Sequence, residues 1–279
     1  MEKTINDFIK KALAEDIGSG DITSLACVTK NSQGTVQLIS KEDCQIAGIE
    51  MARKIYAFYD KTLKVQSFYK DGDSVKKNKC VFILSGNQQS ILATERLVLN
   101  CMQRMSGIAT KTHNFLIRLK GLNTKILDTR KTCPTIRFLD KESVRLGGGE
   151  NHRNGLYDCI MIKDNHVDFS GGIQNAIKNC REYLKKENKK INIIIEVRNI
   201  QELNEVLNYG QIDRILLDNF SIQDTQQAVT IVNNQYPLES SGNIDINNIR
   251  DYAMCGVNYI SIGALTHSVK NIDLSMICI

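Results

Sequence analysis

The sequence lacks the features that mark several classes of protein. It has two prolines among 279 residues and no low-complexity run, which argues against a disordered chain. No apolar run is long enough to span a bilayer, and the N-terminus is a polar amphipathic stretch rather than a signal peptide. Hydrophobic residues make up 42% and charged residues 24%, so we expect one large folded domain or two smaller ones.

The nine cysteines form no disulfide or metal framework. Their number is odd and none belongs to a Cys-x-x-Cys motif, and the four histidines show no zinc-type spacing. We interpret the cysteines as reduced residues in apolar patterns and expect a cytoplasmic protein. The sequence shows no Ser-His-Asp elbow or Cys-His nucleophile pattern, and Cys133 is interpreted as a packing residue.

The charge balance is mild. The 36 basic and 31 acidic residues give a net charge of +5, which is typical of a mixed, solvated surface. The densest basic run, residues 185–190, lies between a helical and a strand pattern and is interpreted as a solvated loop. A nucleic-acid binder would need clustered Lys and Arg with exposed aromatics, and its binding would be sensitive to salt.

The two halves of the sequence predict different orders of helices and strands. The first half predicts an α+β module with helices at residues 5–13 and 50–59 and strands at 35–40, 63–68 and 80–85. A further helix is predicted at 88–104. Ser106-Gly107 separates it from a second helix that ends near Lys120. After Gly121, helical patterns alternate with apolar strand patterns at 125–127, 159–162, 193–197, 215–217, 238–240 and 259–262. Repeated βα units predict a parallel sheet, and strands this short and apolar favour an α/β barrel over an open doubly wound sheet.

Polar residues or glycines follow almost every one of these strand patterns. In a barrel, the carboxyl ends of all strands meet on one face, where active sites are built. The cationic residues that would gather there are Arg130, Lys131, His152, Arg153 and Lys163. Arg and Lys match carboxylate or phosphate oxygens, and the run Gly147-Gly148-Gly149 lets the backbone approach a ligand closely. Residues 128–167 are therefore predicted to bind small, multiply charged anions.

The later strand ends add two further signals. Small residues follow the last two strands, at Ser240-Ser241-Gly242-Asn243 and Ser261-Ile262-Gly263-Ala264. Such loops commonly bind phosphate in barrels, through free backbone N–H groups. Glu196 and Asp218 could hold sugar hydroxyls or Mg²⁺, or stabilise a cationic intermediate. Glycoside hydrolysis by this carboxylate pair fits the surrounding cations less well.

Seven motifs spread over nearly the whole chain carry a family resemblance. They are Glu15-Asp16 through Gly20-Asp21-Ile22-Thr23; Ala47-Gly48; Glu95-Arg96 with Leu99-Asn100; Ser106-Gly107-Ile108-Ala109-Thr110; Asp128-Thr129-Arg130-Lys131-Thr132; Gly147-Gly148-Gly149 with Asn151-His152-Arg153; and Ile162-Lys163-Asp164-Asn165-His166. Together they resemble the nicotinate-nucleotide pyrophosphorylase family, also called the quinolinate phosphoribosyltransferase (decarboxylating) family.

The resemblance implies a fold, a reaction and an assembly. An N-terminal α/β sandwich-like domain, residues 1–108, is rejoined by the C-terminal tail 265–279, and an incomplete α/β (TIM-like) barrel, residues 109–264, carries the active site. The implied pentosyltransferase joins quinolinate to phosphoribosyl pyrophosphate and releases pyrophosphate and CO₂, giving nicotinate mononucleotide for NAD biosynthesis, with Mg²⁺ required. The implied assembly is a homodimer with shared active sites, or a hexamer built as a trimer of dimers.

The resemblance also implies a role for each site residue. Quinolinate would be bound by Arg130, His152, Arg153 and Lys163, with Arg96 supplied by another subunit. Phosphoribosyl pyrophosphate would be bound by Lys131, Glu196, Asp218, Ser241, Gly242, Asn243, Gly263 and Ala264. The catalytic residues would be Lys131, Lys163, Glu196 and Asp218, and the two carboxylates would hold Mg²⁺ directly or through water.

Two positions depart from the family pattern. Asn243 replaces the second glycine of the phosphate loop, and Arg198 stands where an acidic residue is usual. Alternative assignments are a molybdenum-transport-associated protein of the same fold and a phosphosugar-binding barrel isomerase or lyase. The intact run from Lys163 to His166 favours the quinolinate enzyme over the first, and a cation set suited to a dicarboxylate favours it over the second.

Overall fold

The computed structural model describes residues 2–279 and divides into two compact units. Of the described residues, unit 1 comprises 2–113, Thr132–Gly148 and Leu265–Ile279, and unit 2 comprises Asn114–Lys131 and Gly149–Ala264. The segment Thr132–Gly148, which the sequence assigned to the barrel, therefore lies in unit 1. None of the helices within the described residues is long and apolar enough to cross a membrane.

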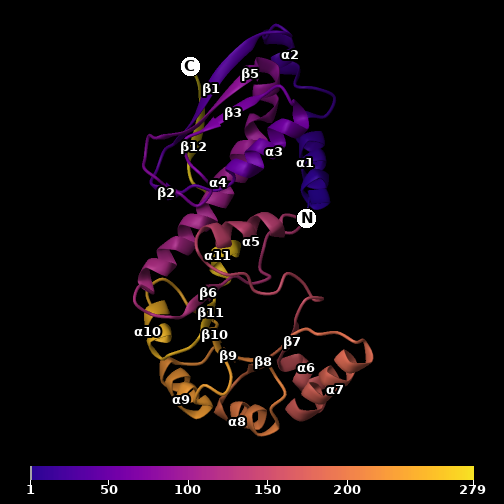
Figure 1. The fold of residues 1–279 in the computed structure, drawn as a ribbon, viewed down its shortest axis with the longest axis vertical. Coiled ribbons are helices and arrows are strands. Elements are labelled where there is room, and N and C mark those ends of the chain that lie inside the picture. The colour runs from indigo at the N-terminus through magenta and orange to yellow at the C-terminus, as the bar shows by residue number, and fades with distance from the viewer. Residues whose placement is uncertain (1) are drawn as a thin grey trace. The chain divides into compact units, whose positions relative to one another are not determined.

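Unit 1 is built on a four-stranded antiparallel sheet in the order β12-β1-β5-β3 (Figure 1). The strands are β1 (Gln33–Ser40), β3 (Lys64–Ser67), β5 (Cys80–Asn87) and β12 (Leu274–Cys278), and β2 (Cys44–Gln45) pairs separately with β4 (Ser74–Val75). The helices are α1 (Glu2–Ile17), α2 (Ile22–Cys27), α3 (Ile49–Tyr59), α4 (Gln88–Arg118), α5 (Arg137–Leu146) and α11 (Ala264–His267). Helix α4 continues into unit 2, and α11 begins at the last residue of unit 2.

The core of unit 1 lies between the sheet and its helices. Alternate residues of β1 and β5, among them Leu38, Phe82 and Leu84, are fully buried. Tyr56 of α3 packs edge-on against Phe82, with ring centroids 6.3 Å apart, so the amphipathic helix and the sheet share one apolar layer.

Helix α4 shows that the predicted break at Ser106-Gly107 is wrong, because the helix runs without interruption from Gln88 to Arg118. The two small residues serve close packing instead. The Ser106 hydroxyl accepts from the Ala47 backbone N–H at 3.0 Å, and a side chain at Gly107 would overlap the Lys270 carbonyl of the C-terminal tail. Gly and Ser therefore allow other backbone segments to approach α4, and they do not end it.

Unit 2 contains a six-stranded parallel sheet in the order β6-β11-β10-β9-β8-β7. The strands are β6 (Lys125–Leu127), β7 (Ile160–Ile162), β8 (Ile193–Val197), β9 (Arg214–Asp218), β10 (Leu238–Ser241) and β11 (Tyr259–Ser261). Helices α7 (Ile173–Lys186), α8 (Ile200–Tyr209), α9 (Ile222–Val232) and α10 (Ile249–Met254) lie along the outer side of the arc of strands, and the short α6 (Asp164–Phe169) follows β7 (Figure 1). Because β6 and β7 stand at the two ends of the order, the barrel is incomplete, as the family resemblance implied.

Candidate active site

The strand ends of unit 2 place polar side chains in two rows across the sheet. In a parallel sheet, residues in register project from the same face, so each row can be read from the strand pairing. The first row comprises Glu196, Leu216, Glu239, Tyr259 and Lys125. The second row lies two residues nearer the carboxyl ends and comprises Asp218, Ser241, Ser261 and Leu127. Glu196, Asp218 and Ser241, all predicted site residues, thus share one face of the sheet.

Lys163 and Glu196 form an ion pair at the end of β7 and β8. The Lys163 Nζ lies 2.5 Å from Glu196 Oε2, and Glu196 is only 8% exposed. The motif that begins with Lys163 starts helix α6, because the Lys163 backbone N–H donates to His166 Nδ1 at 2.9 Å. His166 therefore anchors the backbone of this motif, while the Lys163 ammonium, with three donors, faces the strand ends.

Arg130 and Arg153 supply a concentration of positive charge in unit 2. The Arg153 Nη1 donates to the Cys159 carbonyl at 3.3 Å. Burial and the neighbouring charge of Arg130 both lower the pKa of Arg153 from its usual value. Because two guanidinium groups repel each other, a ligand with two negative charges would relieve this repulsion.

The segment that carries Arg153 is tied to the end of β6. Glu150 forms a parallel bridge with Leu127, and the buried Asp128 carboxylate accepts from the His152 backbone N–H at 2.8 Å. Asp128 is fully buried, so this bond is shielded from water. The motifs around residues 128 and 152, 24 positions apart in sequence, are thus held side by side in unit 2.

The loops after β9 and β10 are interlocked. The Asn219 backbone N–H donates to the Ser241 carbonyl at 2.8 Å, and the Asn243 amide donates to Asn219 Oδ1 at 3.1 Å. Asn219, Gly242 and Asn243 all have positive φ, at 55°, 95° and 54°. Asn243 therefore adopts the left-handed conformation that a glycine would allow, which asparagine tolerates better than most residues. Asn243 thus occupies a left-handed position and adds a side-chain contact with Asn219.

The other phosphate-loop candidates lie at the end of β11. Gly263 and Ala264 follow this strand directly, and Ala264 is the first residue of α11. The Ile262 backbone N–H donates to the Leu127 carbonyl at 3.0 Å, which continues the pairing of β11 with β6. Both residues are half-buried, so their backbone is partly accessible from the strand ends.

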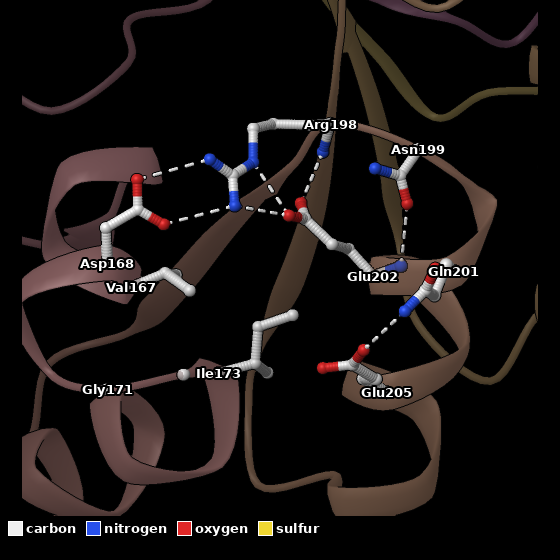
Figure 2. A pocket seen from close by; sticks show the side chains of 10 residues that line it. Val167, Asp168, Gly171, Ile173, Arg198, Asn199, Gln201, Glu202 and Glu205 are labelled. Atoms are coloured by element: carbon white, nitrogen blue, oxygen red, sulfur yellow. Dashed lines mark hydrogen bonds and ion pairs between the residues drawn. The ribbon is translucent and has the colours of Figure 1, made fainter.

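Arg198 belongs to a different feature, a hollow of about 490 Å³ beside α6 and α8. Figure 2 shows its guanidinium between two carboxylates, with 3.2 Å to Asp168 Oδ1 and 2.6 Å to Glu202 Oε1. The next residue, Asn199, caps α8 by accepting from the Glu202 backbone N–H at 3.0 Å. The charge of Arg198 is thus neutralised by acids on two helices and is not added to the charge of Arg130 and Arg153.

Three residues assigned from the sequence are exposed in the structure. Arg96 lies in unit 1, exposed on α4, and Lys131 is an exposed residue of unit 2 whose backbone N–H donates to Thr129 Oγ1 at 3.1 Å. The prediction that Cys133 packs in a core is wrong. This residue is exposed in unit 1, and its backbone N–H donates to the Asp140 carboxylate at 2.9 Å.

Glu239, a fully buried acid in the middle of β10, was not predicted from the sequence. It lies in the first row with Glu196 and contacts His152 and Arg214. The signal was available in the sequence, since a lone carboxylate between Leu238 and Ser240 interrupts an apolar strand pattern as Glu196 does. A buried charge of this kind requires partners.

The acidic residues do not form a complete metal site by themselves. Within residues 2–279, no group of three or more His, Cys, Asp or Glu side chains is placed to hold a metal ion. The residues that could hold a metal ion are two carboxylates at strand ends, Glu196 and Asp218. Asp218 Oδ2 also accepts from the Asn219 amide at 2.9 Å. Mg²⁺ is commonly bound by one or two carboxylates together with substrate phosphates and water, so this pair fits an ion that arrives with a pyrophosphate.

Comparison with known proteins gives one consistent result. Residues 21–106 match the family profile of the quinolinate phosphoribosyl transferase N-terminal domain, and residues 108–277 match that of the C-terminal domain. A chloroplastic nicotinate-nucleotide pyrophosphorylase [carboxylating] from Arabidopsis thaliana is 42% identical, over 96% of this chain and 81% of its own length. A probable nicotinate-nucleotide pyrophosphorylase [carboxylating] from Bacillus subtilis is 37% identical, over 99% and 92%. The solved structure of nicotinate-nucleotide pyrophosphorylase from Francisella tularensis is 38% identical with a TM-score of 0.94, over 100% of this chain and 97% of that one.

Proposed function

We propose that this chain, which belongs to the quinolinate phosphoribosyl transferase family, joins quinolinate to phosphoribosyl pyrophosphate and releases pyrophosphate and CO₂. The product, nicotinate mononucleotide, is a precursor of NAD. The observation that carries the proposal is the pair Arg130 and Arg153, whose mutual repulsion suits a dianion, in the same unit as the acidic and small-residue strand ends.

The dicarboxylate end of the site is proposed to consist of Arg130, Arg153 and Lys163, with His152 beside Arg153. Guanidinium groups bind carboxylates through two parallel hydrogen bonds, which fixes the orientation of a planar ring as well as its position. Arg96 of a second copy of the chain is proposed to complete this end. It is exposed on α4 one turn after Leu92, an apolar side chain that is 43% exposed, as expected of a surface that another subunit covers.

The sugar-phosphate end is proposed to consist of the loops after β10 and β11. Ser241, Gly242, Asn243, Gly263 and Ala264 would present backbone N–H groups and a hydroxyl to the 5′-phosphate. Lys131, which is exposed and follows Arg130 directly, would approach the pyrophosphate as a point charge. The ribose would then lie over Glu196 and Asp218, between the two ends of the site.

The chemistry needs positioning more than a nucleophile. The bond from ribose C1 to the pyrophosphate oxygen breaks, and the pyridine nitrogen forms the new bond to C1. Glu196 and Asp218 stabilise the positive charge that develops on the sugar, and binding both substrates in one orientation supplies much of the rate. The resulting pyridinium then accepts the electron pair left when the 2-carboxylate departs as CO₂, and the ring carbon takes up a proton. Mg²⁺, held by the same carboxylates, would supply charge neutralisation for the departing pyrophosphate.

We also propose an assembly and a cellular setting. A homodimer in which each α4 contributes Arg96 to the other copy is the smallest assembly that completes the site, and three such dimers could form a hexamer. The nine free cysteines suit a reducing compartment, so we propose that the protein acts in the cytoplasm.

An assay with both substrates and Mg²⁺ tests the reaction. Folded protein should release nicotinate mononucleotide and CO₂ in equal amounts, and chelation of Mg²⁺ should abolish the reaction without unfolding the protein. Nicotinate, which has only one carboxylate, should be a much poorer acceptor because one of the two anion contacts is lost. Absence of product from folded protein, or a preference for nicotinate, would refute the proposed function.

Replacement of Gly242 by alanine tests the phosphate loop. The new methyl group would overlap the side-chain oxygen of Asn219 and displace the interlocked loops. We expect the KM for phosphoribosyl pyrophosphate to rise on the order of tenfold to a hundredfold, while the KM for quinolinate changes little, since misplacement of a binding group is costly. Steady-state kinetics with each substrate varied in turn would measure this.

Gly121→Ala is the matched control. Gly121 has a similar φ of 87°, against 95° for Gly242, but nothing lies within 4 Å of the added methyl group. Both substitutions therefore carry backbone strain of about 1–2 kcal/mol, and only one displaces the loops. Equal KM values in the two variants would contradict the assignment of the loop.

A further inference from the structure

Glu239 has an unusual environment for a carboxylate. It is fully buried in the middle of β10, and its Oε2 lies 2.9 Å from Arg214 Nη1 and 3.4 Å from His152 Nε2. Burial would raise the pKa of Glu239, but its contacts with His152 and Arg214 outweigh burial and hold the pKa below the usual value. Glu239 is therefore charged in the folded protein and fixed between two nitrogen donors.

Arg214 is one of the two partners of the Glu239 carboxylate. Its guanidinium carbon lies 3.9 Å from the centre of the Tyr259 ring, in the next strand but one, so the side chain is clamped between an aromatic face and the carboxylate. The charge of Glu239 is thus balanced by Arg214 within the sheet. The contact with His152 is an additional one that charge balance does not require.

Both ring nitrogens of His152 face groups of the protein. The Nδ1 accepts from the Arg153 backbone N–H at 2.7 Å, so this nitrogen carries a lone pair. The proton of the neutral ring must then reside on Nε2, which faces Glu239. His152 therefore has a hydrogen bond through Nδ1 and one from its backbone N–H to Asp128, and its Nε2 lies 3.4 Å from the Glu239 carboxylate.

We propose that Glu239 is a positioning residue that locks His152 in the Nε2–H form, so that His152 holds the backbone of Arg153 in place. His152 then acts on the dicarboxylate through Arg153 and does not bind it through a ring nitrogen. A carboxylate that fixes the tautomer and orientation of a histidine is a common arrangement where the opposite nitrogen has a defined task. This inference rests on the proposed function only for the identity of the ligand that Arg153 binds.

Two substitutions of His152 separate the roles of its nitrogens. Asparagine places an oxygen acceptor where Nδ1 stands and can still hold the Arg153 N–H, whereas glutamine places an amide where Nε2 stands and loses that acceptor. We expect kcat/KM for quinolinate to be on the order of tenfold higher in His152→Asn than in His152→Gln, since a hydrogen bond to a structured group is worth about that factor. Equal or reversed activities would overturn the proposal, because a ring that binds substrate through Nε2 favours glutamine.

Glu239→Gln tests the carboxylate itself. We expect on the order of a tenfold to hundredfold fall in kcat/KM for quinolinate, mainly through KM, with the KM for phosphoribosyl pyrophosphate unchanged. In the His152→Asn background the same substitution should have little further effect, because a residue that acts through His152 has no role once the ring is gone. Additive losses in the double variant would overturn the proposal.

Nitrogen-15 NMR of the histidine rings gives a test that does not depend on activity. The chain has four histidines, and the signal missing in His152→Asn identifies His152. In the native protein at pH 7.5 this ring should show one protonated nitrogen, Nε2, and one with a free lone pair, Nδ1. In Glu239→Gln the chemical shifts of Nδ1 and Nε2 should move toward each other, because the ring then exchanges between its two tautomers. An Nδ1–H ring, or no change on substitution, would overturn the inference, whereas an inactive native protein with the expected ring signals would refute only the proposed function.

Discussion

Lys163→Met should lower kcat/KM for quinolinate by roughly a thousandfold, the largest loss expected of any single substitution in unit 2. The ammonium contributes a positive charge for the dicarboxylate and lies 2.5 Å from Glu196, the carboxylate proposed to stabilise the developing charge on the ribose. Methionine keeps the length of the side chain and removes the charge, so a nearly buried Glu196 loses its ion-pair partner. Steady-state kinetics would measure the loss, and circular dichroism would confirm that the variant is folded.

Lys125→Met is the matched control for this substitution. Lys125 also pairs with a glutamate, Glu150, at 2.7 Å, but at the amino end of β6, where the side chains are 54% and 48% exposed. An exposed pair contributes little, so we expect kcat/KM to stay within about twofold of the native value. Comparable losses in both variants would show that removal of any lysine in unit 2 harms the enzyme and would contradict a specific role for Lys163.

Mixed dimers extend the same experiment to Arg96. Arg96→Ala and Lys163→Met should each be inactive alone, because each destroys every site. If Arg96 acts on the other copy, random mixing should restore about one quarter of the sites, since each hybrid dimer then contains one site with both native residues. Mixed dimers that form but recover no activity would contradict the shared site.

Asp140→Ala should destabilise the protein by about 3–5 kcal/mol, the largest effect on stability that we expect. The carboxylate is fully buried and accepts from Arg104 Nε and Nη2 at 2.8 Å each, and from the Cys133 backbone N–H at 2.9 Å. Alanine leaves the Arg104 side chain, which is only 23% exposed, without its counter-charge. Urea unfolding, compared at equal slope, would measure the change in the free energy of unfolding.

Glu142→Ala provides the comparison within the same helix, α5. Glu142 pairs with Arg145 at 2.5 Å, a shorter distance than that of Asp140 and Arg104, but both side chains are largely solvent-accessible, at 44% and 61%. Its removal should cost less than about 1 kcal/mol. A similar cost for the two variants would mean that burial does not decide the strength of these pairs.

The alternation of strands and helices in the second half of the chain could be predicted from sequence because each strand is a short apolar run and each helix has its own periodicity. The break at Ser106-Gly107 could not be judged in the same way. Local propensity opposes a glycine inside a helix, but the tail at Lys270 and the loop at Ala47 pack against those two residues and override it. The pairing of β12 with β1, which joins Val36 to Cys278, involves partners too distant for any local pattern.

The positions of the candidate site residues on the sheet were easier to predict from the sequence than their side-chain contacts. Acidic residues near the ends of apolar strand patterns predicted that Glu196 and Asp218 would share one face of a parallel sheet, and the strand pairing places them there. Arg198 could not be placed from the sequence, because its direction depends on Asp168 and Glu202, which lie on two different helices. Glu239 was missed although it interrupts an apolar strand pattern as Glu196 does, because its partners His152 and Arg214 come from distant parts of the sequence.

The pairing of β12 with β1 also has a consequence for the order in which the protein folds. The sheet of unit 1 receives its fourth strand from residues 274–278, so a chain emerging from the ribosome completes unit 2 before that strand can pair. Until then β1 presents an unpaired edge that can bind strands of other chains. Closing a loop of this length also slows folding, because long-range pairing must overcome the entropy of the intervening chain. Pairing of the last strand therefore completes the sheet of unit 1, and it covers an edge that is open to aggregation until that step.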